Sequence, residues 1–78
     1  MNVFISADIE GTCGITDWSE TERSTPRDYV PFQKQMTREV KAACKGALDA
    51  GVGEIFLKDA HDSARNIDAA ELPECIRI

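Results

Sequence analysis

The sequence predicts an open α/β fold, in which alternating strands and helices build a parallel sheet. Short apolar, β-rich runs occupy residues 3–5, 54–57 and 75–78. One long stretch between the first two runs has apolar residues at spacings of three and four, which is typical of an amphipathic helix. Strands joined through a helix pair in parallel by a right-handed crossover.

The first predicted strand, residues 3–5, ends at Ser6-Ala7-Asp8 and has the apolar, β-branched character of a buried strand. From residue 11 to about residue 29 there is no clean periodicity. Residues 16–27 are crowded with Thr, Ser, Asp and Glu, which favour turns. We expect a long loop here, and long loops in compact domains commonly carry function.

A long helix is predicted to begin at Pro31, which suits a first helical turn, and to end before Gly51, a C-terminal stop signal. Its buried stripe is predicted to contain Phe32, Met36, Val40, Ala43, Cys44, Ala47 and Leu48. The opposite, solvated face is predicted to carry Lys34, Arg38, Lys41, Lys45 and Asp49.

After the strand at 54–57, the sequence predicts a polar loop at 58–66, a single helical turn at 68–72 and a third strand at 75–78. One long helix covers only one face of a sheet, whereas parallel sheets are normally covered on both. We therefore expect residues 1–78 to be a single incomplete α/β domain. We expect it to be the N-terminal βαβ(α)β part of a larger three-layer domain with a parallel or mixed sheet.

Charge and composition exclude several classes of protein. With 14 acidic and 9 basic residues the formal charge is -5, so no positive excess is available to bind a phosphate backbone, and no nucleic-acid partner is expected. No apolar run approaches the roughly 20 residues of a membrane span, and no signal peptide is recognisable, so we expect no membrane partner and a cytoplasmic location. The cysteines fit neither a disulfide framework nor a Cys-x-x-Cys metal site, which favours a reducing compartment.

The chemistry is expected at the carboxyl ends of the strands, where ligands gather in open α/β sheets. Asp8 and Glu10 follow the first strand, and Asp59 and His61 follow the second with the same spacing. If the backbone stays extended, this spacing points each pair the same way, and all four side chains converge. Two carboxylates and an imidazole suit zinc, manganese or iron. If Asp8 and Glu10 are desolvated together, their like charges cost free energy unless a cation balances them. If they instead cap their loop, no cation is needed.

Several other residues are assigned structural roles and not chemical ones. Gly11 and Gly14 are expected to form a tight turn near the carboxylates. Trp18 either anchors its own loop or lines a pocket or subunit contact. Asn66 is expected to cap the following turn. Cys13 is expected to be a small buried residue rather than a thiolate ligand, and Cys44 and Cys75 are expected in the core.

From Ser6 to Gly11, with Gly14 three residues on, the sequence resembles the opening of the D-aminopeptidase family of binuclear zinc peptidases. The resemblance spans essentially the whole chain, and Asp-x-Glu-Gly becomes specific only in combination with the later matches. These are Met36-Thr37, Glu39-Val40, Ala43, Gly46-Ala47-Leu48, Ala50-Gly51, Glu54, Asp59-Ala60-His61 and Arg65-Asn66.

The resemblance implies a zinc-dependent aminopeptidase that hydrolyses short peptides with N-terminal D-amino acids. It implies two Zn²⁺ ions per subunit, with Asp8 bridging both while Glu10 and His61 complete the protein ligands of the first. Asp59 is expected to contact one of the metal ligands and not the metal itself. The remaining ligands and the catalytic His of the family match no residue of this sequence, so no catalytic residue is assigned. The family assembles into homo-oligomeric rings, with decamers of two pentamers expected. Asp62 departs from the Gly that commonly follows the metal-binding His.

Two alternatives remain at this stage. Asp8-Ile9-Glu10-Gly11-Thr12 also resembles the strand-end motif of haloacid-dehalogenase-like phosphatases, with Asp8 as phosphoryl acceptor, Glu10 as acid/base and Mg²⁺ as cofactor. That interpretation gives His61 no role, and the second strand lacks the expected Ser or Thr. The other alternative is a truncated, non-catalytic module that retains the carboxylate pair.

Overall fold

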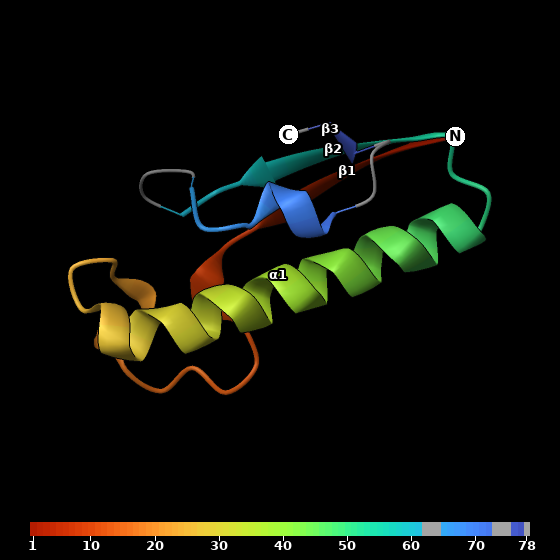
Figure 1. Cartoon of the computed structure of the whole chain (residues 1–78). Helices are drawn as coiled ribbons and strands as arrows, with labels where there is room; N and C mark the ends of the chain where they lie inside the picture. Colours follow the sequence, from red (N-terminus) through yellow and green to blue (C-terminus); the bar gives the residue numbers. More distant parts are fainter. Residues whose placement is uncertain (62–64, 73–75, 78) are drawn as a thin grey trace.

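The computed structural model describes residues 1–61, 65–72 and 76–77, and shows a parallel sheet with one long helix packed against it (Figure 1). The sheet order is β1-β2-β3, and both neighbouring pairs are parallel. The elements in chain order are β1 (Asn2–Ala7), η1 (Ile9–Gly11), η2 (Trp18–Thr21), α1 (Pro26–Asp49), β2 (Glu54–Asp59), η3 (Ala69–Glu71) and β3 (Ile76–Arg77). The predicted α/β class is confirmed.

The two long strands alternate between a face that packs on α1 and a face that does not. Ile55 and Leu57 of β2 are buried in the core, and Val3 and Ile5 of β1 pack against it opposite them. On the other face Phe4, which pairs with a phenylalanine of β2, is 67% exposed. The first strand is therefore partly buried on one face only, because α1 lies on one side of the sheet, as expected for a single long helix (Figure 1).

Helix α1 begins at Pro26, five residues before the predicted start at Pro31. The sequence Thr25-Pro26 supplies the start, since proline suits a first helical position, where its missing N–H has no intrahelical partner. Pro31 lies inside the helix and leaves one main-chain hydrogen bond unmade. The added turn is held by Tyr29, which is only 3% exposed.

The buried stripe of α1 agrees with the prediction at Met36, Val40 and Cys44, which are all buried, whereas Phe32, Ala47 and Leu48 are partly buried. Ala43 is exposed, contrary to the prediction. It lines a groove beside β1 with residues that include Ile5, Ala7 and Glu39. Since β1 is the last strand on that side of the described sheet, nothing packs over Ala43 there.

The segment expected to be a loop from residue 11 to residue 29 is more regular than predicted. It contains η2 and the first turn of α1. Asp17 caps η2, and the Glu20 carboxylate accepts from the main-chain N–H groups of Thr16 and Asp17, which completes a capping box. Thr25 donates its hydroxyl to the carbonyl of Ser19 at 2.6 Å, which ties η2 to the start of α1.

The predictions for the three cysteines have different outcomes. Cys44 is fully buried in the core, as expected. Cys13 is exposed, contrary to expectation, because its main-chain N–H turns toward the Glu39 carboxylate at the protein surface. Cys75 lies outside the described residues. Among the described helices, none combines the length and apolar character that crossing a membrane requires.

Candidate metal centre

The carboxyl ends of β1 and β2 meet at one edge of the sheet. The register places Ala7 opposite Asp59, and the N–H of Ala60 donates to the carbonyl of Ala7 at 2.7 Å. The two strands are therefore direct neighbours up to their last residues. The segments that leave them, with Asp8 on one and His61 on the other, emerge side by side.

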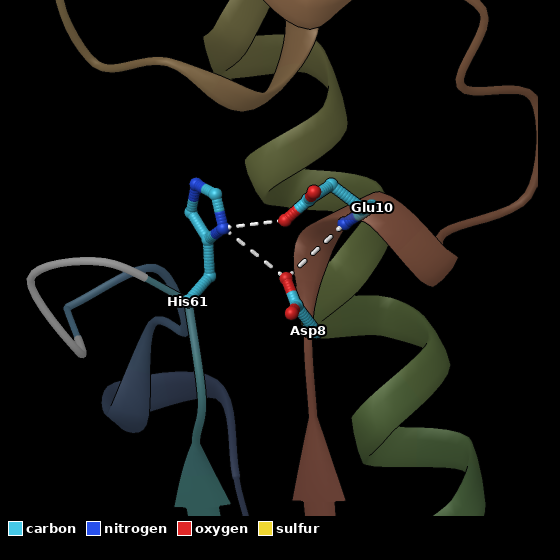
Figure 2. A group of neighbouring side chains, drawn as sticks. All are labelled: Asp8, Glu10 and His61. Atoms are coloured by element: carbon cyan, nitrogen blue, oxygen red, sulfur yellow. Dashed lines mark hydrogen bonds and ion pairs between the residues drawn. The ribbon is translucent and has the colours of Figure 1, made fainter.

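Three of the four predicted side chains converge in this place (Figure 2). His61 Nδ1 lies 3.2 Å from Asp8 Oδ1 and 2.8 Å from Glu10 Oε1. One ligand atom from each residue lies within 4.8 Å of the other two. The predicted convergence of Asp8, Glu10 and His61 is thus present in the structure.

Glu10 reaches the cluster through a turn and not through an extended chain. Asp8 is the N-cap of η1, and its Oδ1 accepts from the N–H of Glu10 at 3.5 Å. Ile9, between them, is fully buried and anchors the turn in the core. The assumption of an extended backbone is wrong, but the turn brings the two carboxylates together all the same. The Asp8 and Glu10 side chains remain 49% and 39% exposed, so they are less desolvated than expected.

The imidazole of His61 is oriented by a hydrogen bond at Nε2, the ring nitrogen that faces away from the carboxylates. Its Nε2 lies 2.8 Å from the main-chain carbonyl oxygen of Thr21, in η2. A carbonyl oxygen only accepts hydrogen bonds, so Nε2 carries a proton and Nδ1 is the atom presented to the carboxylates. Such an outer contact is how metal-binding histidines are usually fixed. Sequence reasoning missed Thr21, because a main-chain carbonyl leaves no mark on the residue type.

The charges around His61 favour its protonated form when no cation is present. Burial acts to lower the pKa of His61, but the Thr21 carbonyl and the Glu10 and Asp8 carboxylates outweigh it, so the pKa is raised above the ordinary 6.5. In that form the imidazolium donates from Nδ1 to the carboxylates. A proton and a metal ion therefore compete for the same nitrogen.

Asp59 does not join the cluster, which corrects the expectation of four converging side chains. It is 5% exposed and accepts from Asn66 Nδ2 and from the main-chain N–H groups of Asn66 and Ile67. The predicted capping role of Asn66 is also wrong. Asp68 caps the following turn, since its Oδ1 accepts from the N–H of Ala70. Asn66 is 1% exposed and lies behind His61.

The remaining predictions near the site have separate outcomes. Gly14 has a φ of 91°, which confirms a tight turn that favours glycine. Trp18 is 72% exposed and does not anchor its loop in the core. It lines a hollow of ≈ 350 Å³ together with Glu10, so the pocket interpretation is retained. Asp62 lies outside the described residues.

The donor set fits a zinc ion. Ligand atoms about 2 Å from a tetrahedral zinc lie about 3.3 Å from one another. The separations of His61 Nδ1 from the Asp8 and Glu10 oxygens, 3.2 and 2.8 Å, are close to that value. The same distances suit an imidazolium between two carboxylates. The geometry is therefore compatible with both the metal-bound and the metal-free, protonated cluster.

Comparison with known proteins identifies the family of this chain. Over residues 1–78, the whole sequence matches the family model described as D-aminopeptidase. The chain belongs to the D-aminopeptidase family. The family match agrees with the resemblance carried by the Asp8 and His61 motifs, and it gives no support to the phosphatase alternative.

The fold of this D-aminopeptidase family chain is similar to that of the Zn-dependent D-aminopeptidase DppA from Bacillus subtilis, described as a self-compartmentalizing protease. The TM-score is 0.92, and the sequences are 25% identical over 99% of this chain. The match covers 28% of the DppA chain, so the chain spans little more than a quarter of that relative. No match is found among curated proteins.

Proposed function

We propose that this chain carries part of the metal site of a zinc-dependent aminopeptidase that hydrolyses short peptides with N-terminal D-amino acids. The observation that carries the proposal is the convergence of Asp8, Glu10 and His61 at the ends of two neighbouring strands. Family membership and the likeness to DppA support it. The zinc dependence and the D-amino acid preference are part of the proposal.

Each residue of the cluster has a definite role in it. Asp8, Glu10 and His61 would hold the zinc, with Asp8 shared between two ions and Glu10 and His61 completing the protein ligands of the first. Bound zinc supplies Lewis acidity toward a scissile carbonyl and lowers the pKa of a water molecule. Thr21 holds the Nε2 proton of His61, which keeps Nδ1 free to bind.

The rest of the catalytic apparatus lies elsewhere in the proposal. We propose that residues 1–78 form the N-terminal portion of a longer, cytoplasmic protein. The further zinc ligands and the catalytic His belong to its other part. We also propose that the protein assembles into a homo-oligomeric ring, with a decamer expected, and particle size in solution tests this assembly. DppA, described as self-compartmentalizing, supports this assembly.

The test measures zinc content by mass spectrometry, and hydrolysis of a D-alanyl amide, in the full-length protein. We compare Asp8→Ala, Glu10→Ala and His61→Ala with Asp49→Ala, an exposed acidic residue at the end of α1 that controls for net charge. Asp8→Ala is expected to lose the most zinc because a bridging carboxylate serves two ions. Small and equal losses in all three site variants, matching Asp49→Ala, would contradict the proposal.

A further inference from the structure

His61 is also held through its main chain, by a residue that does not belong to the group of Asp8, Glu10 and His61. Asn66 Nδ2 donates to the carbonyl oxygen of His61 at 2.7 Å and to Asp59 Oδ1 at 2.9 Å. Asn66 is 1% exposed, so water does not compete for these bonds. The side-chain amide of Asn66 therefore links His61 to the buried carboxylate of Asp59 at the end of β2.

The orientation of this amide is determined by its partners. A carboxylate and a main-chain carbonyl only accept, so both must receive hydrogens of Nδ2. Asn66 Oδ1 then accepts from the Tyr29 hydroxyl of α1 at 2.7 Å. Burial raises the pKa of Tyr29, Arg23 acts in the opposite direction and Asp59 adds to the increase, so the hydroxyl keeps its proton. Turning the amide over would set its oxygen against two acceptors, the Asp59 carboxylate and the His61 carbonyl.

We propose that Asn66 is a positioning residue for His61 and that Tyr29 fixes the orientation of its amide. The inference rests on the proposed metal function and deepens it. His61 is then held at two points, by Thr21 at the ring and by Asn66 at the main chain, while Nδ1 faces the carboxylates. Preorganisation of this kind spares an incoming metal ion the cost of ordering its ligand.

The contribution of the Asn66 side chain is separable from the folding of the loop. Asp59 also accepts from two main-chain donors, the N–H of Asn66 at 2.5 Å and the N–H of Ile67 at 2.8 Å. Neither bond depends on the identity of residue 66. Replacing the Asn66 side chain therefore leaves the chain attached to Asp59 and releases the carbonyl of His61.

The test uses three variants of the full-length protein. Asn66→Asp keeps the side-chain shape and the acceptor for Tyr29 but removes both donors. Its added negative charge attracts cations, so a loss of zinc affinity would not come from charge. Tyr29→Phe keeps the donors and releases Oδ1. Thr37→Val is the matched control, because Thr37 is buried on the same helix and, within the described residues, its hydroxyl bonds to the carbonyl of Gln33 and the N–H of Asp68 and not to His61.

Zinc affinity is measured by competition with a chelator. We expect a loss of about 10- to 100-fold in Asn66→Asp, about threefold or more in Tyr29→Phe, and no change in Thr37→Val. Wild-type affinity in Asn66→Asp overturns the inference, as does wild-type affinity in Tyr29→Phe should Asn66→Asp fail to fold. An equal loss in Thr37→Val overturns it too, since the effect would then be one of general stability.

A second measurement separates this inference from the proposed function. The ¹⁵N shifts of the His61 imidazole are recorded in the metal-free protein, where the ring is expected to move away from Thr21 in Asn66→Asp. If the wild type binds no zinc, the proposed function fails, and these shifts alone decide the role of Asn66. Unchanged shifts overturn the positioning role, and changed shifts support it.

Discussion

Zinc binding should depend on pH through His61, and the direction follows from its surroundings. The raised pKa means that the metal-free protein holds a proton on Nδ1 at pH values where a free imidazole, with a pKa near 6.5, has begun to lose it. Zinc must displace this proton. Below the raised pKa, each unit of falling pH should weaken zinc binding about tenfold, or about 1.4 kcal/mol. Above it, this contribution levels off.

Folding of the metal-free protein should respond in the opposite sense. A histidine whose pKa is raised on folding stabilises the fold fully below its unfolded pKa, and this stabilisation is lost as pH rises through the folded pKa. Raising the pH should therefore weaken the metal-free fold on account of His61 while strengthening zinc binding. The increase in melting temperature on adding zinc should grow with pH.

The assay combines an NMR titration of the His61 imidazole in the metal-free protein with chelator competition between pH 5.5 and 8. His61→Ala identifies the signal. Glu10→Gln is the matched variant, because it removes one of the charges that raise the pKa and should lower the His61 pKa relative to the wild type. A wild-type His61 pKa below 6.5, or zinc affinity independent of pH, would refute the reasoning.

Three further predictions concern other parts of the chain. Asp59→Ala leaves three donors around a buried position without their acceptor, so it should destabilise the protein by about 3 kcal/mol or more in denaturant unfolding, whereas exposed Lys58→Ala should stay within about 0.5 kcal/mol. Asp8→Asn should lose zinc, and the wild type should form no aspartyl phosphate with phosphoryl donors; trapping one would restore the phosphatase alternative. Expressed alone, residues 1–78 should aggregate, because Phe4 and Phe56 expose an apolar sheet face, and a soluble monomer with cooperative unfolding would contradict this.

The order of the main elements and the candidate ligands could be predicted from the sequence. The spacing of apolar residues along α1 and the short β-rich runs reflect local geometry, which the sequence records directly. The same holds for Asp8 and His61, because residues that follow parallel strands come out at one edge of the sheet whatever the details of packing.

The support of the site depended on the tertiary structure. Thr21 contributes a main-chain carbonyl to a residue 40 positions away, and Tyr29 bonds to Asn66 across 37 positions. Carbonyl oxygens are the same in every residue type, so no sequence pattern marks the one that orients His61. Asp59 precedes His61 by two positions, as Asp8 precedes Glu10, yet its carboxylate accepts hydrogen bonds from the donors of Asn66 and Ile67. A buried carboxylate must find hydrogen-bond donors, and only the folded chain determines where they lie.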